Sequence, residues 1–362
     1  MATTKYRAYT NVPKPSPKLV EIIKQSGMTL YLNPGAIVQL IDPDTSVLQI
    51  TVGRQESIFK LTDIRAIIAT EAEIKSSALT KILRWRIPVI LFSQSGEFLG
   101  RIEPDYKIRA DIDIMQCQAM MTDAMRVEIM QGAAWGRLRR LLRFLQRSGR
   151  DGAVEISQAS KDILHLSNCI TNHDSIASLQ GLIGQAMLIF YRILPQCINP
   201  DWRFTSRHDN SPVCRMLDFS ENLLEESIKN AVFSVGLNPN LGYWHQNHHQ
   251  TKGLITDLTT EFQILAIACV KTILNRGYIT PQDFNKCWDE NTLPLVAAQA
   301  ITRAYQVKMA TEISYPQIKI KCTYEDLFYI QAKQLILYLQ GQIQEYYSPD
   351  LKYLDSDDSS DS

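Results

Sequence analysis

The sequence predicts an α+β protein, in which an N-terminal β-sandwich-like domain is followed by a larger all-α domain. Short β-branched and apolar runs, separated by turn residues, recur up to about residue 104. Long stretches with helical spacing of apolar residues and few breakers follow that point. The length of 362 residues is enough for two domains, and 45% hydrophobic with 21% charged residues is the composition of folded globular proteins.

The β-rich domain is expected over residues 19–104. Turn chemistry separates several of its runs, notably Asp42-Pro43-Asp44 and the stretch 93–96. One helix interrupts the strands after Ser76 and Ser77, which are good N-cap types. This pattern predicts a small sandwich that carries one helix, and not a series of β-α-β units. The expected strands cover residues 28–32, 36–41, 47–52, 57–61, 64–69, 89–92 and 98–102.

The helical domain is expected over residues 105–348, with Pro and Gly marking the joins between helices. Residues 349–362 are predicted to be a disordered acidic tail, because positions 355–362 contain only Ser and Asp. The expected helices cover residues 112–145, 175–194, 212–236, 254–276, 281–288, 293–313 and 324–344.

Charge, cysteine content and hydropathy exclude several classes of protein. Thirty-eight basic and 38 acidic residues give a formal net charge of zero, so binding of nucleic acid through bulk charge is excluded and any DNA contact needs a local patch. Seven cysteines without a C-x-x-C pair exclude zinc ribbons and thioredoxin motifs and favour a reduced, cytoplasmic location. The most apolar windows, 186–194 and 264–274, fall short of the roughly 20 residues that span a bilayer. We therefore expect a soluble protein with no membrane partner.

Polar chemistry gathers in residues 242–261, where His245, His248 and His249 precede Asp257. The common nucleotide-binding, hydrolase and zinc-protease signatures are absent from the chain. A histidine and a carboxylate at a loop–helix junction can bind Mn²⁺ or Mg²⁺, with water and a substrate phosphate as further ligands. The spacing alone favours the alternative, a polar surface loop whose Asp257 caps a helix.

A second candidate site is an arginine-rich stretch whose only acidic neighbours are Asp123 and Glu128. On a helix, four of its arginines share one side and could follow the phosphate backbone of DNA. The alternative is a solvated helix face, which is what most charged runs are. The stretch contains Arg126, Arg137, Arg139, Arg140, Arg143, Arg147 and Arg150, of which Arg137, Arg140, Arg143 and Arg147 share the side.

Several segments, in order along the chain, resemble one family. They are Ile-Pro-Val at 87–89, Gly-Arg-Ile-Glu-Pro at 100–104, Gly-Leu-Asn-Pro at 236–239, Gly-Tyr-Trp-His at 242–245, Asp-Leu at 257–258, and 275–284. Together they resemble the CRISPR-adaptation integrase and endonuclease family, CRISPR-associated protein one, over nearly the whole chain. The resemblance implies a β-rich domain that forms a homodimer and a helical domain that carries the active site. It also implies insertion of foreign double-stranded DNA into a repeat array, together with a small partner, CRISPR-associated protein two.

The family's metal site, which takes Mn²⁺ or Mg²⁺, uses a glutamate, a histidine and a further acid. His245 matches the histidine, and Asp257 matches the first acid of a D-x-x-[DE] segment. The second acid of that segment falls on Thr260, and Glu261 follows one position later, about 100° away on a helix. The family's glutamate falls on Ile183. The resemblance therefore implies a DNA integrase or endonuclease with weakened or lost catalysis; the alternative is a non-catalytic, dimerising DNA-binding scaffold.

Overall fold

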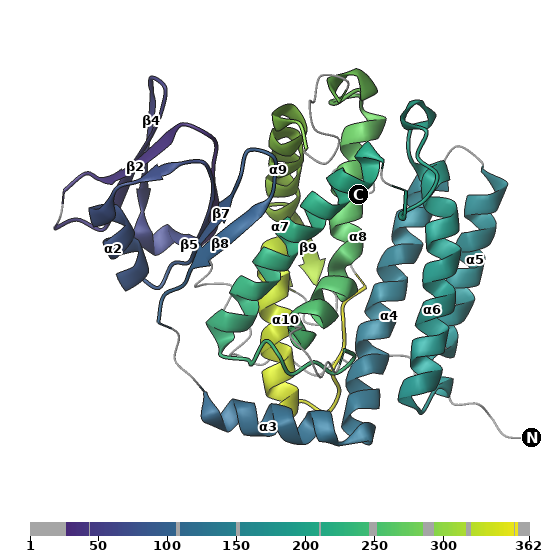
Figure 1. Ribbon diagram of the computed structural model, residues 1–362. Helices are drawn as coiled ribbons and strands as arrows, with labels where there is room; N and C mark the ends of the chain where they lie inside the picture. Colours follow the sequence, from purple (N-terminus) through teal and green to yellow (C-terminus); the bar gives the residue numbers. More distant parts are fainter. Residues whose placement is uncertain are drawn as a thin grey trace, which may run out of the picture.

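The protein consists of a β-rich part and a larger helical part that lie side by side, as the computed structural model in Figure 1 shows. The α+β fold class is confirmed. The β-rich part is at the N-terminal side of the sequence and lies beside helices α7 and α9. The structure describes residues 27–42, 44–105, 109–149, 153–209, 211–245, 252–284, 293–315, 320–350 and 352–353.

The β-rich part contains two four-stranded sheets. The first has the order β1-β5-β7-β8, and its strands are β1 (Met28–Leu32), β5 (Ile64–Thr70), β7 (Val89–Phe92) and β8 (Phe98–Ile102). The second has the order β4-β3-β2-β6, and its strands are β4 (Gln55–Lys60), β3 (Val47–Val52), β2 (Ala36–Leu40) and β6 (Glu73–Ile74). Helix α2 (Ser76–Arg84) lies between β5 and β7 in the chain, and these two strands pair in parallel. One β-α-β connection is therefore present, although the sequence pattern predicts a sandwich without such units.

The first sheet separates two hydrophobic cores. Ile68 of β5 and Phe92 of β7 belong to the core of the helical part, whereas Ile67 and Val89 belong to the core between the two sheets. This division follows from the strand period of two, which sends successive side chains to opposite faces. Both faces are apolar, as expected for mostly parallel strands covered on two sides. The sheet is thus shared between the two parts of the protein.

Two buried arginines of the first sheet connect it to the helices. Arg101 of β8 contacts Glu226 and donates a 2.7 Å hydrogen bond to Asn230. Arg65 of β5 pairs with Asp326 at 2.7 Å. Because a buried guanidinium needs an acceptor, these pairs favour one position of the sheet on the helices.

The helical part contains long helices joined by short turns. The expected stretch 112–145 is two helices, because Thr122 adopts an extended conformation (φ −107°, ψ 104°) between them. The helix at 154–169 was not predicted. The α-helices are α3 (Ala110–Met121), α4 (Asp123–Ser148), α5 (Val154–Cys169), α6 (Ile176–Ile193), α7 (Pro212–Val235), α8 (Gly253–Asn275), α9 (Leu295–Met309) and α10 (Tyr324–Leu339). Short 3-10 turns are η1 (Leu61–Asp63), η3 (Ile170–Asn172), η4 (Leu194–Cys197), η5 (Pro200–Trp202) and η6 (Pro281–Asp283). Of the helix expected at 281–288, the structure describes only residues 281–284, which contain η6.

A small sheet lies within the helical part, which is therefore not purely α. Its order is β10-β9-β11, formed by β10 (Ile320–Thr323), β9 (Glu312–Tyr315) and β11 (Lys352–Tyr353). The predicted start of the disordered tail at residue 349 is therefore too early. Residues 352–353 form β11, and Asp350 pairs with Arg139 and Arg143. Residues 355–362, on which that expectation depended, lie outside the described residues.

Two helical stretches, Ile176–Cys197 and Gly253–Asn275, are long and apolar enough to cross a membrane, which differs from the expectation drawn from shorter windows. Length and composition are weak criteria, because core helices also meet them. Helix α8 packs against α4, α7 and α9, and 72% of its most apolar window is buried. The stretch Ile176–Cys197, which begins with α6, packs against α4 and α5, with 33% of its window buried.

Helix α4 carries two glycines where the chain segment 346–348 crosses it closely. A Cβ atom on Gly132 would lie 2.1 Å from the carbonyl oxygen of Tyr346, and one on Gly136 would lie 2.3 Å from Oγ of Ser348. Neither distance is compatible with a side chain at those positions. The glycines therefore allow the C-terminal segment to reach the interior of the helical part.

We expect Gly136→Ala to destabilise the protein, by about 1–3 kcal/mol as for other overpacked sites. Gly181→Ala in α6 is the matched control, since nothing lies within 4 Å of its added Cβ. The control should stabilise the protein by about 0.5–1 kcal/mol through helix propensity. Chemical unfolding of both variants measures the difference, and equal effects would contradict the close crossing.

Candidate metal and nucleic-acid site

The residues His245 and Asp257 are brought together at the start of α8. The Asp257 side chain is fully buried, and its Oδ1 lies 2.6 Å from His245 Nδ1. The backbone N–H groups of Trp244 and His245 donate 2.9 Å hydrogen bonds to Oδ2 and Oδ1 of the same carboxylate. Asp257 is therefore not the helix cap, which is Lys252; it binds the loop that precedes the helix. His248 and His249 lie outside the described residues.

Two glycines allow this loop to approach the helix. A Cβ on Gly242 would lie 2.7 Å from Asp257 Oδ2, and one on Gly253 would lie 2.5 Å from the carbonyl oxygen of His245. The close backbone contact positions the loop N–H groups over the carboxylate. The Gly-Tyr-Trp-His segment thus has a local structural reason for its first residue.

His245 is the one member of this pair that is accessible from outside. Its side chain is 36% exposed, whereas that of Asp257 is 0% exposed. Because the carboxylate contacts Nδ1, the proton of a neutral imidazole is favoured on that nitrogen, which leaves the lone pair on Nε2. A carboxylate–histidine pair of this kind is a common second layer of metal sites. Nε2 of His245 could therefore serve as one metal ligand.

The positions expected to carry further acidic ligands contribute none. Ile183 of α6 is buried in the helical core. Thr260 donates a 2.9 Å hydrogen bond from Oγ1 to the carbonyl oxygen of Asp257, one turn earlier in α8. Among the residues that the structure describes, no group of three or more His, Cys, Asp or Glu side chains is placed to hold a metal.

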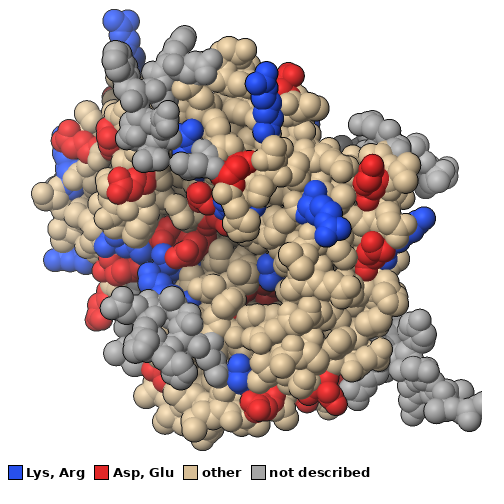
Figure 2. Space-filling view, turned by 45° about the vertical axis from the view of Figure 1, so that its right-hand side comes forward, with Lys and Arg blue, Asp and Glu red and all other residues tan. Residues whose placement is uncertain are grey.

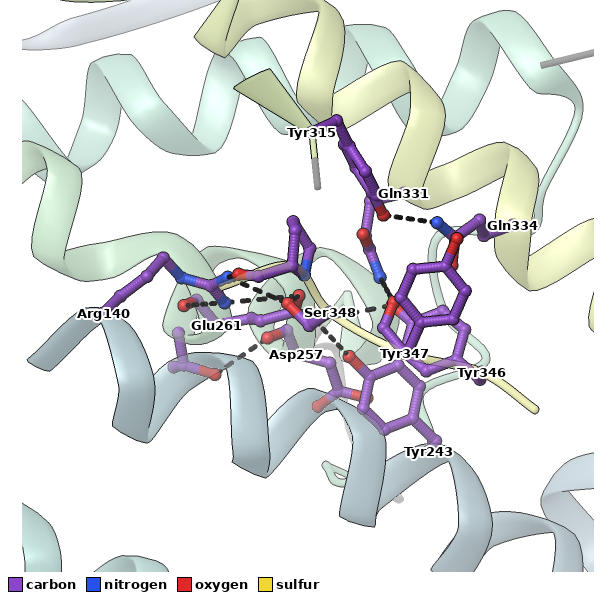
Figure 3. A network of polar contacts seen from close by, with 12 residues as sticks. Arg140, Tyr243, Asp257, Glu261, Tyr315, Gln331, Gln334, Tyr346, Tyr347 and Ser348 are labelled. Atoms are coloured by element: carbon purple, nitrogen blue, oxygen red, sulfur yellow. Dashed lines mark hydrogen bonds and ion pairs between the residues drawn. The ribbon is translucent and has the colours of Figure 1, made fainter. Parts of the chain in front are cut away.

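The carboxylate of Glu261, the residue after Thr260, is buried, and both of its oxygens have hydrogen-bonding partners inside the protein. Figure 3 shows Arg140, Glu261 and Ser348 pointing toward one another. Arg140 contacts Oε1 at 3.4 Å and donates a 3.0 Å hydrogen bond to the backbone carbonyl of Glu261, and the Ser348 hydroxyl also donates to Oε1. Tyr243 and Tyr346 donate to Oε2 at 3.2 and 3.4 Å. Burial raises the pKa of Glu261, and Arg140 partly opposes this.

Comparison with known proteins gives a consistent result. A family model described as "CRISPR associated protein Cas1" matches residues 36–307. The chain belongs to the Cas1 family. A CRISPR-associated endonuclease Cas1 of Thermus thermophilus is 23% identical over 287 residues, which cover 77% of this chain and 83% of the relative.

Two solved structures share the fold. A casposase bound to its integration product has a TM-score of 0.71 at 20% identity, covering 88% of this chain and 92% of that one. A chain of a Cas6-RT-Cas1–Cas2 complex has a TM-score of 0.69 at 18% identity, covering 90% of this chain and 36% of that one. At these identities the likeness concerns the fold alone.

The Cas1 family is metal-dependent, and the residues of this Cas1 chain do not fit that requirement. A hard divalent cation needs several oxygen ligands, and carboxylates supply most of the attraction. Here Asp257 is turned to the loop, Glu261 is paired with Arg140, and the remaining two positions are Ile183 and Thr260. His245 Nε2 alone is a poor site for Mn²⁺ or Mg²⁺.

The arginine row lies on α4, as expected, but it is not a simple DNA-binding face. Arg140 is buried and paired with Glu261, so it does not lie on an exposed row of cations. Arg143 pairs with Asp350 at 3.1 Å, and Arg137 is half-buried, which lowers the pKa of its guanidinium. Arg147 lines a cavity between helices. The face drawn in Figure 2 shows basic and acidic side chains interspersed in small groups and not one broad basic surface.

We expect Arg140→Met to destabilise this Cas1 protein by about 3–5 kcal/mol, because it leaves the Glu261 carboxylate buried without a cation. Without Arg140 the pKa of Glu261 rises further, so the lost stability should return as the pH falls through that pKa and the carboxyl group becomes neutral. Unfolding experiments over a pH series test this. The double variant Arg140→Met with Glu261→Met is the control; a loss as large as that of the single variant, independent of pH, would contradict the pairing.

Proposed function

We propose that this Cas1 family protein acts in the insertion of DNA segments into CRISPR repeat arrays, with weakened or lost catalysis at its own metal site. The observation that carries the proposal is the donor set around His245. Its neighbour Asp257 is committed to the loop, and no acid stands at 183 or 260. In a metal-dependent enzyme, a metal stabilises charge on the leaving oxygen when the phosphodiester breaks, whereas binding of the backbone requires only well-placed cations and N–H groups.

The proposed partners are double-stranded DNA, a second copy of the chain and a Cas2-like small subunit. The two similar structures support DNA and a Cas2-like subunit as partners, since one is a casposase bound to its integration product and the other is a chain of a Cas6-RT-Cas1–Cas2 complex. A cytoplasmic location is supported by the described cysteines, all of which are free. A second candidate function is a non-catalytic scaffold that binds DNA beside an active subunit, and the same donor set favours it.

The first test is restoration of the missing ligands. The unmodified protein should show no Mn²⁺- or Mg²⁺-dependent cutting or joining of duplex or branched DNA. Ile183→Glu with Thr260→Glu should raise Mn²⁺ affinity measured by calorimetry, because each substitution adds an anionic oxygen ligand.

Ile183→Gln with Thr260→Gln is the matched control, with the same size and no charge, and it should leave Mn²⁺ binding unchanged. Thermal unfolding of both variants is needed, since an unpaired carboxylate at the buried position 183 costs about 2 kcal/mol or more without metal. Strong Mn²⁺-dependent turnover by the unmodified protein, abolished by His245→Ala, would overturn the proposal.

The second test concerns the proposed homodimer through the β-rich domain. Strand β4 is at the edge of its sheet, and Ile58 on it is 64% exposed. Exposed edges and apolar side chains favour pairing with another chain. Ile58→Lys should shift the sedimentation profile toward monomer at micromolar concentration, whereas Glu56→Gln on the same strand should not. Sedimentation of the unmodified protein as a monomer at micromolar concentration would contradict the proposed homodimer.

A further inference from the structure

A basic cavity of about 890 Å³ lies between α4, α8 and α9. Its lining includes Arg147 of α4, Lys271 and Arg276 of α8, and Arg303 and Lys308 of α9. Arg140 and Arg143 of α4 line it as well, and none of the described lining residues is Asp or Glu. Arg140 is paired with Glu261 and Arg143 with Asp350, but together the cations of the lining, in a chain of zero net charge, form a basic site for an anionic ligand.

The environment of the cavity strengthens interactions with an anion. Burial, together with the charge of Arg147, lowers the pKa of Lys308 to about 8. Nε of Arg140 is buried and has no hydrogen-bond partner among the described residues. Both observations indicate a positive region with restricted access to water, where a carboxylate or phosphate is attracted more strongly than at the surface.

The C-terminal segment of the chain already reaches the border of this cavity. Asp350 binds Arg143, which lines it. Three residues later, Tyr353 of β11 pairs with Ile313 of β9, and Thr311, two residues before Ile313, lines the cavity too. The last described residue of the chain, Tyr353, is therefore paired with a strand that begins close to the cavity lining.

The sequence of residues 354–362, Leu-Asp-Ser-Asp-Asp-Ser-Ser-Asp-Ser, matches the cavity in charge and in length. It contains four aspartates and no basic residue. Nine extended residues reach about 30 Å. The lining part of α9, from Gln299 to Lys308, spans about 14 Å at 1.5 Å per residue. The segment is long enough to place carboxylates near Lys308, Arg303 and Arg147.

We propose that the acidic segment 354–362 binds in the basic cavity between α4, α8 and α9 and competes there with the phosphates of nucleic acid. Its position in the same chain gives it an effective concentration on the order of millimolar. Even weak binding of the segment is then populated, and a nucleic acid must displace the segment before its phosphates can bind in the cavity. The binding of the segment in the cavity is independent of the proposed function. Only the competition with nucleic acid rests on the proposed function.

Photo-cross-linking in the full chain tests the binding directly. Benzoyl-phenylalanine incorporated at position 359 should cross-link, within one chain, to peptides of α8 or α9 identified by mass spectrometry. The cross-links should disappear in Arg303→Glu with Lys308→Glu, and the same probe at position 57 is the control. Cross-links only to other surfaces, or only between isotopically distinct copies, would overturn the proposal.

Binding of a fluorescent 20-base-pair duplex tests the competition. Replacing Asp355, Asp357, Asp358 and Asp361 with Ser should tighten duplex binding by at least about twofold, the minimum for a millimolar contact at millimolar effective concentration. The same replacement in the Arg303→Glu, Lys308→Glu protein should change nothing. Equal affinity with and without the aspartates would overturn the competition. Intact cross-links without any duplex binding would support the docking and count against the proposed function alone.

Discussion

The buried pair of Arg140 and Glu261 is the interaction on which the helical part depends. A carboxylate in the interior needs a cation and further donors, or it takes up a proton. Arg140 comes from α4 and Glu261 from α8, while Tyr243 precedes α8 and Ser348 belongs to the C-terminal segment. Four distant parts of the chain thus meet at one charged group. The glycines of α4 leave room for the segment that carries Ser348 to reach this charged group.

The pair of Arg140 and Glu261 also affects which carboxylates of α8 could bind a metal. Asp257 and Glu261 lie four positions apart on α8 and are both buried, but they bind different parts of the chain. Asp257 accepts hydrogen bonds from the loop that carries His245, and Glu261 accepts from the interior network. Ordinary helix geometry places both on nearly the same side. Helix α8 therefore supplies two carboxylates, and the folding of the chain uses both.

Much of this could be predicted from local sequence patterns, because helices and strands leave periodic signals. The expected helix at 254–276 differs from α8 by one residue at each end. Helix α5 was missed although Ile156, Ala159 and Ile163 follow helical spacing, so the signal was present. The departures at Ile183 and Thr260 were visible in the sequence. The roles of Arg140 and Arg143 were not, because their acidic partners are 121 and 207 positions away. A local charge pattern contains no information about such partners.

The arginines of α4 also explain how a chain without net charge can still have a strongly basic site. Toward the middle of the helix, Arg140 is neutralised by an acid from another element. Toward its end, Arg147 joins Lys271, Arg303 and Lys308 around a cavity. Low-dielectric walls focus the field of such a group, so its attraction for a polyanion is local and strong. If the metal site is inactive for lack of acids, as proposed, this placement of cations is the property of the helical part on which the proposed binding of DNA would depend, and an acidic segment of the same chain has the charge to compete for it.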